Sequence, residues 1–107
     1  MVIHQYEIYL VNLDPTAGSE IRKTRPCVII SPDEMNQGLR TVQIAPMTTN
    51  TRQYPWRVQT RLQNKKGAIA LDQIRSIDKR RLVKHLGALH NGEIQDLKKI
   101  LHQMLID

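Results

Sequence analysis

The segment Gly18-Ser19-Glu20-Ile21-Arg22-Lys23-Thr24-Arg25-Pro26 separates two apolar runs, Ile8–Leu13 and Cys27–Ile30. Both runs are rich in β-forming residues, so they predict two strands joined by a polar loop. A residue before proline is pushed into an extended conformation, and a proline without an N–H suits the first position of a strand. Arg25 is therefore expected where the loop enters the sheet, with a guanidinium that can grip a phosphate through two parallel hydrogen bonds. The alternative is an ordinary solvated loop whose basic residues serve solubility.

The second strand of this pair is predicted to span Cys27–Ser31, and further short strands are predicted after it. Apolar or alternating patterns indicate these strands at Thr41–Pro46, Trp56–Arg61, Ala68–Leu71 and Val83–Leu89. The intervening segments predict loops at Asp33–Leu39 and Met47–Pro55, a hairpin turn at Asn64–Gly67 and extended chain at Asp72–Ile77.

The last segment of the sequence predicts the one clear helix. Apolar residues recur there at helical spacing, at Ile94, Leu97, Ile100, Leu101, Met104 and Leu105. Asn91 is the expected N-cap of this helix, and Asp78 is expected to cap a short helical turn over Lys79–Leu82. Short strands followed by a terminal helix predict one domain over residues 1–107, mainly β with a C-terminal α-helix and folded as a small twisted barrel.

The composition is that of a folded domain with no route into a membrane. At 107 residues and 40% hydrophobic content, the chain can build one core. No apolar run approaches the ~20 residues of a membrane span, and Met1–Tyr6 lacks the apolar centre of a signal peptide. We therefore expect a cytoplasmic protein that does not bind membranes. The single Cys27 cannot form an internal disulfide and is expected to be a small buried hydrophobic residue.

The distribution of charge points to a polyanionic partner. The sequence has 16 Lys and Arg against 10 Asp and Glu, which gives a net charge of +6. The stretch from Met35 to Leu71 contains no acidic residue, and the basic residues within it account for the whole excess. Nucleic acid is the commonest partner of such a surface. The alternative is a basic face without a dedicated ligand.

The sequence lacks the usual signatures of metal-dependent and nucleophile-dependent hydrolysis. The four histidines are scattered without ligand spacing, and no Ser-His-Asp elbow, Walker loop or glycine fingerprint is present. Neither a metal nor a cofactor is expected. Tyr54 and Trp56 could stack on a base, although Trp56 suits a core position equally well. Such a chain could still cleave RNA, because RNA carries its own nucleophile, the 2′-hydroxyl. The protein then needs only to position the phosphate, stabilise the pentavalent transition state and help to move protons.

Five sequence blocks, taken together, resemble the MazF/PemK family of bacterial toxins. The blocks occur in family order from about Ile8 to the final helix. They are Asp14-Pro15-Thr16-Ala17-Gly18-Ser19-Glu20, Arg25-Pro26-Cys27-Val28-Ile29-Ile30-Ser31-Pro32, Ala45-Pro46-Met47-Thr48-Thr49, Tyr54-Pro55 and Asp72-Gln73-Ile74-Arg75-Ser76-Ile77.

This resemblance implies a fold and an activity. The fold it implies is an SH3-like barrel of the PemK/CcdB type, assembled as a homodimer. The activity it implies is that of a ribosome-independent endoribonuclease, the toxic half of a type II toxin–antitoxin pair. Such an enzyme would cut single-stranded RNA at a short sequence, without a metal, to leave a 2′,3′-cyclic phosphate and a 5′-hydroxyl. The partners implied are single-stranded RNA and a cognate antitoxin with an acidic, disordered tail.

The resemblance also assigns roles to residues. Arg25 and Thr48 match the catalytic arginine and threonine of the family, Glu20 matches the acid of the Gly-Ser-Glu block, and Asp72 that of the Asp-Gln block. Because an arginine pKa lies above ~12, Arg25 is expected to stabilise charge at the phosphate rather than to donate a proton. Thr48 is expected to hydrogen-bond a phosphate oxygen, and Glu20 to serve as base or to pair with a neighbouring arginine. Asp72 is either catalytic or structural. Ala70 stands where some relatives carry an arginine. RNA binding is expected of Arg22, Lys23, Thr49, Arg52, Tyr54, Arg57, Arg61 and Arg75.

Two other functions compete with this interpretation. A gyrase poison of the CcdB type shares the fold, but its Trp-Gly-Ile tail has no counterpart in Leu105-Ile106-Asp107. A passive SH3-like RNA-binding module would explain the basic middle of the chain but would give Arg25 and Thr48 no purpose.

Overall fold

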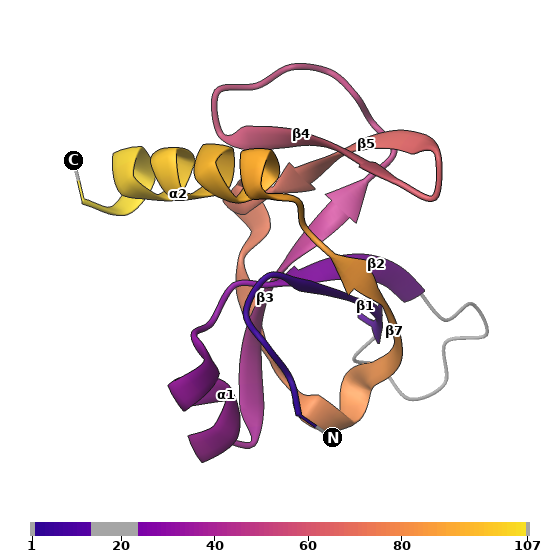
Figure 1. The fold of residues 1–107 in the computed structure, drawn as a ribbon, viewed down its shortest axis with the longest axis vertical. Helices are drawn as coiled ribbons and strands as arrows, with labels where there is room; N and C mark the ends of the chain where they lie inside the picture. The colour runs from indigo at the N-terminus through magenta and orange to yellow at the C-terminus, as the bar shows by residue number, and fades with distance from the viewer. Residues whose placement is uncertain (1, 14–23, 107) are drawn as a thin grey trace.

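A computed structural model of the chain describes residues 2–13 and 24–106. Within these ranges the fold is mainly β and ends in a long helix, as predicted (Figure 1). The elements are, in chain order, β1 (Glu7–Asn12), β2 (Thr24–Ile29), α1 (Asp33–Gly38), β3 (Thr41–Thr48), β4 (Arg57–Leu62), β5 (Lys65–Ala70), the 3₁₀ turn η1 (Leu71–Gln73), β6 (Arg75–Asp78), the 3₁₀ turn η2 (Lys79–Arg81), β7 (Leu82–Ala88) and α2 (Asn91–Leu105).

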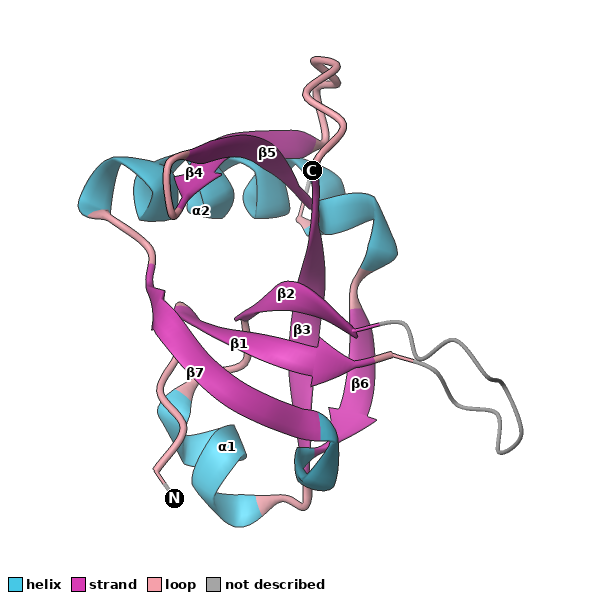
Figure 2. Ribbon diagram, turned by 90° about the vertical axis from the view of Figure 1, so that its right-hand side faces the viewer, coloured by secondary structure: helices cyan, strands magenta, loops and turns pink. Residues whose placement is uncertain are grey.

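The strands of the described ranges form one antiparallel, strongly curved sheet in the order β4-β5-β3-β2-β1-β7. On the side of β3 away from β2, β6 pairs with the first half of that strand and β5 pairs with its end. In Figure 2 β1, β2 and β7 run across the direction of β3 and β6, so the sheet curls into a half-barrel. The predicted small barrel is confirmed in this form.

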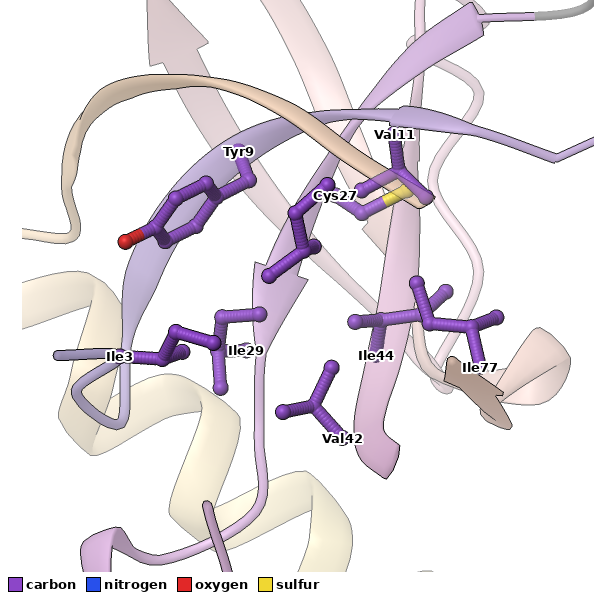
Figure 3. Close-up of a cluster of buried hydrophobic side chains, with 9 residues drawn as sticks. Ile3, Tyr9, Val11, Cys27, Ile29, Val42, Ile44 and Ile77 are labelled. Atoms are coloured by element: carbon purple, nitrogen blue, oxygen red, sulfur yellow. The ribbon is translucent and has the colours of Figure 1, made fainter. Parts of the chain in front are cut away.

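Both faces of the sheet are covered by apolar side chains. One face buries Tyr9, Cys27, Ile29 and Ile44, with their neighbours, inside the curl of the sheet (Figure 3). The opposite face carries a second cluster, which includes Ile8, Val28, Met47 and Ile69 of the sheet and Leu97 of α2. Successive residues of β1 and β2 therefore point into different cores, as the doubly apolar pattern of these runs predicts.

Helix α2 lies where the sequence predicts it, with two differences at its ends. Its predicted apolar stripe packs on the sheet as far as Leu101, but Met104 and Leu105 are exposed. The N-cap is His90 and not Asn91, because the Glu93 carboxylate accepts a hydrogen bond of 2.9 Å from the His90 N–H. This side chain does the capping from the third helical position, so Asn91 is left as the first residue of the helix.

The predicted loop at Asp33–Leu39 is wrong, because α1 occupies most of it. The six-residue helix has no apolar stripe, and its buried side chain is polar. Asn36 donates to the Ser31 carbonyl at 2.9 Å and accepts from the Ser31 hydroxyl. Asp33 and Glu34 occupy its first turn, where negative charge complements the helix dipole. A helix held by hydrogen bonds of this kind leaves no hydrophobic periodicity in the sequence.

Three strands begin or end beyond their predicted limits, and each difference concerns the candidate site. Strand β2 begins at Thr24, so Arg25 and Pro26 lie within it, and the proline is tolerated because pairing with β3 starts only at Cys27. Strand β3 continues to Thr48, which was expected in a loop. The β4–β5 turn has positive φ at two adjacent residues, Gln63 and Asn64, and is therefore shorter than predicted.

Two short 3₁₀ turns frame β6. In the second, the Asp78 carboxylate accepts a hydrogen bond of 2.8 Å from the Arg80 N–H, so the predicted cap at Asp78 is confirmed. In the first, Leu71–Gln73 form η1, where extended chain was expected. Elsewhere in the described ranges, no helix combines the length and the apolar character needed to cross a membrane.

Candidate nucleic-acid interface

The pairing of β2 with β3 brings Arg25 and Thr48 to the same level of the sheet. Cys27 pairs with Pro46 in an antiparallel ladder. Arg25 and Thr48 each lie two residues beyond this last pair of the ladder, so their side chains belong to the same face of the sheet as Cys27 and Pro46. Arg25 is exposed and Thr48 half-buried. Two residues that are 23 positions apart in the sequence therefore converge at one end of the sheet.

Arg75 joins them from β6. It pairs with Ile44, which also pairs with Ile29 of β2, so Arg75 lies on the same face as Arg25 and Thr48. The positive charges of Arg75 and Arg25 both act to lower the pKa of the Cys27 thiol, so both guanidinium groups lie within electrostatic range of this buried residue. Two of the predicted phosphate-binding cations are thus close to the same part of β2.

Cys27 itself is not a nucleophile. Its side chain is fully buried, and burial raises the pKa of the thiol to about 12 against the opposing effect of the two arginines. The sulfur contacts the Arg25 carbonyl at 3.5 Å as a weak donor. The prediction that Cys27 is a small buried hydrophobic residue is confirmed.

After Thr48, the last residue of β3, the chain enters a loop that is held by side-chain hydrogen bonds. The Thr48 hydroxyl accepts a hydrogen bond of 3.2 Å from the Asn50 N–H, and the Asn50 side chain accepts one of 3.0 Å from the Arg52 N–H. A hydroxyl that accepts in this way still has its hydrogen to donate. The Thr48 hydroxyl is therefore available as a donor to an external acceptor.

Gly67 holds the backbone of Thr48 in place from the neighbouring strand. A Cβ added to this glycine would lie 2.6 Å from the Thr48 carbonyl oxygen, well inside van der Waals contact. Only glycine permits β5 to approach the end of β3 so closely.

A cavity of about 280 Å³ opens beside Thr48. Its lining includes Pro26, Thr48, Thr49, Lys65, Lys66 and Gly67. Sequence reasoning missed the two lysines as site residues because it placed them in a turn. The signal that would have found them is Gln63-Asn64, since two adjacent residues that adopt positive φ make a two-residue turn and leave Lys65 and Lys66 in a strand.

A second cavity of about 640 Å³ extends the basic surface along β4. Arg61 and Lys66 line it together with Thr51, Gln59 and His90 at the start of α2. The acidic Glu93 also lines it, with its carboxylate already accepting from the Thr60 hydroxyl and the His90 N–H. Arg61 is exposed there, in accordance with its predicted outward position on the strand.

Arg57 differs from the expected outward arginine. It makes a bidentate ion pair with Asp72, with Nε–Oδ1 at 3.1 Å and a second N–O distance of 3.3 Å. Only 13% of the Arg57 side chain is exposed, against 33% of the Asp72 side chain. The sequence could not reveal this pair, because the two residues lie 15 positions apart and meet only when β4 pairs with β5. Of the two roles left open for Asp72, this geometry favours the structural one.

The ion pair should contribute a pH-dependent stability. The hydrogen bonds from Arg57 hold the pKa of the Asp72 carboxyl below its ordinary value of 3.8. A lowered carboxyl pKa stabilises the fold above the unfolded-state pKa, and this stabilisation is lost as the pH falls through the folded-state pKa. We therefore expect Asp72→Asn to lower the free energy of unfolding at pH 7 by about 1 kcal/mol, seen as a lower melting temperature. The effect is small because solvent screens the partly exposed pair. The difference from the parent should begin to shrink at about pH 4 and close as the pH falls through the lowered folded-state pKa.

The control for this measurement is the Arg57→Gln background, in which Asp72→Asn should have no pH-dependent effect. Melting curves by circular dichroism at both pH values test the expectation. A difference between parent and Asp72→Asn that is the same in acid as at pH 7 would contradict it.

Tyr54 and Trp56 form a stacked pair at the end of the β3–β4 loop. Their ring centroids are 5.2 Å apart with an interplanar angle of 18°. The guanidinium carbons of Arg57 and Arg52 lie 5.0 Å and 5.4 Å from the centre of the Tyr54 ring. Three of the predicted RNA-binding residues, Arg52, Tyr54 and Arg57, thus form one assembly.

Three of the predicted site residues, Glu20, Arg22 and Lys23, lie outside the described residues. Among the residues that are described, no three His, Cys, Asp or Glu side chains gather closely enough to hold a metal ion.

Comparison with known proteins places the chain in a family. The profile of the family described as the PemK-like, MazF-like toxin of type II toxin–antitoxin system matches residues 4–105, nearly the full length. The chain belongs to this family. It is also 36% identical to a protein named Endoribonuclease MazF9 from Mycobacterium tuberculosis (strain ATCC 25618 / H37Rv), with 89% of each chain covered.

Solved structures of this family share the fold. A crystal structure of MazF from Deinococcus radiodurans is 25% identical, with 100% of this chain and 99% of that chain covered at a TM-score of 0.82. A MazE–MazF complex from the same organism is also 25% identical and covers 98% and 97% of the two chains at a TM-score of 0.82. The resemblance drawn from the five sequence blocks is confirmed.

Proposed function

We propose that this PemK/MazF-family chain is a metal-independent endoribonuclease that cuts single-stranded RNA in the cytoplasm by attack of the substrate's own 2′-hydroxyl. The observation that carries the proposal is the register of β2 with β3, whose continuation puts Arg25 and Thr48 on one face of the sheet, with Arg75 on the same face. This constellation supplies two cations and a hydroxyl donor at one place on the surface. A protein named as an endoribonuclease is also among its relatives.

The proposed step is an intramolecular transesterification. The 2′-oxygen bonds to the adjacent phosphorus, its proton passes to a base, and the bond from phosphorus to the 5′-oxygen breaks. The 5′-oxygen takes up a proton and leaves as a hydroxyl, and the phosphate remains as a 2′,3′-cyclic diester. Negative charge builds up on the non-bridging oxygens in between, and stabilising this charge lowers the barrier.

Each residue has a separate part in this step. Arg25 stabilises the charge on the phosphate, because a guanidinium binds two oxygens at once and stays protonated. Thr48 donates its free hydroxyl hydrogen to a phosphate oxygen, in the orientation that the Asn50 N–H supports. Glu20 is the proposed base for the 2′-hydroxyl, on the strength of its place in the Gly-Ser-Glu block. Asp72 is assigned to holding Arg57, with which it is paired.

Incubation of purified protein with mixed single-stranded RNA tests the proposal. We expect cleavage that persists in excess EDTA, with cyclic phosphate and 5′-hydroxyl ends on the fragments. Fragments with 5′-phosphate and 3′-hydroxyl ends, or activity that disappears in EDTA and returns with magnesium, would contradict it. The control is the same RNA methylated at its 2′-oxygens, which cannot attack and should stay intact.

We further propose that the chain acts as a twofold dimer and is restrained by a cognate antitoxin with an acidic, disordered tail. Large apolar side chains at Val83, Met104, Leu105 and Ile106 are exposed on the single chain, as expected of a surface that another molecule covers. Structures that contain MazE with MazF have the same fold as this chain. A basic RNA groove is also a complementary surface for an acidic peptide.

Static light scattering at micromolar concentration tests the assembly. The expected mass is twice the 12.4 kDa of the chain. A mass equal to that of one chain would contradict the dimer and leave the ribonuclease proposal untouched, because the Arg25–Thr48 pair lies within one chain.

A further inference from the structure

Trp56 forms an exposed aromatic surface next to the candidate site. It stacks on Tyr54, but 41% of its own surface remains exposed, so it is not the core anchor that the sequence equally allowed. Tyr54 is only partly exposed, since it lies against Trp56 and close to two guanidinium groups. We define the Tyr54–Trp56 pair as the aromatic platform.

The aromatic platform packs against the ion pair of Arg57 and Asp72. Arg57 lies 5.0 Å from the centre of the Tyr54 ring, and both carboxylate oxygens of Asp72 hold the Arg57 side chain. A guanidinium over a ring face is itself attractive, and the bidentate pair removes its freedom to swing away. Trp56 is therefore presented in an orientation that is set before any ligand arrives, which reduces the entropy lost on binding.

The register of the strands gives the separation between the aromatic platform and Thr48. Thr48 pairs with Ala68, which pairs in turn with Gln59, two residues along β4 from Arg57. Two strand spacings and two residue steps put Arg57 on the order of 10 Å from Thr48 along the sheet. The aromatic platform thus lies near enough for a nucleotide close to the cleaved phosphate to reach it.

The charge around the aromatic platform favours a nucleic acid over an acidic or apolar protein segment. The sequence from Met35 to Leu71 has no acidic residue, and the nearby Asp72 is already neutralised by Arg57. Arg52 is exposed beside the rings, where it can meet a phosphate while the rings meet a base. Alternating cations and aromatic faces are the general means of binding single strands.

From these observations we infer that Trp56 is a stacking site for one unpaired nucleobase of the RNA strand, with Arg52 on the adjoining phosphate. This inference rests on the proposed ribonuclease function and adds to it a residue that binds one nucleotide beside the cut. Stacking tolerates every base but is strongest for purines, so the site would contribute a graded preference rather than an absolute one.

Tryptophan fluorescence measures this site directly, because Trp56 is the only tryptophan in the sequence. The probe is a short single strand of 2′-O-methyl RNA made to the mapped cleavage sequence, which binds but cannot react. We expect tryptophan fluorescence to be quenched in step with binding measured by anisotropy. A series of strands, each lacking one base, should contain one position at which the quenching disappears while the phosphate contacts remain.

Two variants measure the contribution of the ring. Trp56→Leu should weaken binding of the same strand roughly 5- to 100-fold, and Trp56→Phe should recover most of the affinity. The matched control is Leu39→Ala, a truncation of an exposed apolar residue at the α1 end of the molecule, opposite the β3–β4 loop (Figure 2), which should bind as the parent does. Circular dichroism melting confirms that each variant is folded.

Different failures have different meanings. If the protein cleaves RNA but no missing base changes the quenching, or if Trp56→Leu binds RNA as the parent does, the stacking site is overturned and the ribonuclease proposal stands. If an acidic peptide quenches the fluorescence and RNA does not, the surface belongs to a protein partner and the inference is overturned as well. A chain that neither cleaves RNA nor binds the strands overturns both.

Discussion

Replacing Arg25 by alanine should lower the single-turnover rate of RNA cleavage by about 10²–10³-fold, while the affinity for RNA falls only modestly. The guanidinium acts on charge that appears only in the transition state, so its loss affects the rate more than the binding. Arg25→Lys should not restore the rate, because a point charge cannot make two parallel hydrogen bonds to the phosphate. Rates are measured at saturating protein so that weakened binding does not lower them.

Two other arginines separate catalysis from binding. Arg61 lines the larger basic cavity, and Arg61→Ala should weaken binding of all sequences, reduce the salt slope by about one unit and cleave normally at saturation. Arg40 is exposed next to α1 at the far end of β3, and Arg40→Ala should match the parent. If Arg25→Ala cleaves at the parent rate under these conditions, Arg25 only binds RNA and its catalytic assignment is wrong.

Loss of the Thr48 hydroxyl should have the second largest effect on the rate. Thr48→Ala removes a donor to the transition state and should cost about 2–4 kcal/mol of barrier, or roughly 30- to 1000-fold in rate. Thr48→Ser keeps the hydroxyl and should recover most of the cleavage rate. Single-turnover cleavage is again the measurement.

The control for Thr48 lies on the same strand. Thr41 begins β3 at its other end and is exposed, so Thr41→Ala tests what the loss of a threonine hydroxyl does to the strand alone. It should leave the rate unchanged. A Thr48→Ala rate equal to that of Thr41→Ala would show that the hydroxyl plays no part in the reaction.

The elements that could be predicted from the sequence are those whose signal is local. The doubly apolar runs at Ile8–Leu13 and Cys27–Ile30, the stripe on α2 and the cap at Asp78 each depend on residues a few positions apart. Their strand and helix assignments are therefore confirmed. Helix α1 escaped prediction because buried hydrogen bonds of Asn36, and not an apolar face, hold it in place.

The site shows the same division. The sequence blocks identified Arg25 and Thr48 as candidate site residues, but only the register of β2 with β3 shows that they share one face of the sheet. The ion pair between Arg57 and Asp72 has no local signature, so Arg57 was expected to face outward and the role of Asp72, catalytic or structural, was left open. Pairings across strands depend on tertiary structure, which a single sequence does not reveal.

Strand β3 has a consequence for the motions of the protein. Ile44 is paired on both sides, with β2 and with β6, so its amide hydrogen should exchange with solvent only when the fold opens globally. Four residues further on, Thr48 keeps its pairing to β5 beyond the described ladder with β2. Thr48 thus lies at the end of a strand whose middle is paired on both sides, so a small adjustment of this end to a bound RNA strand would leave the pairs at Ile44 intact.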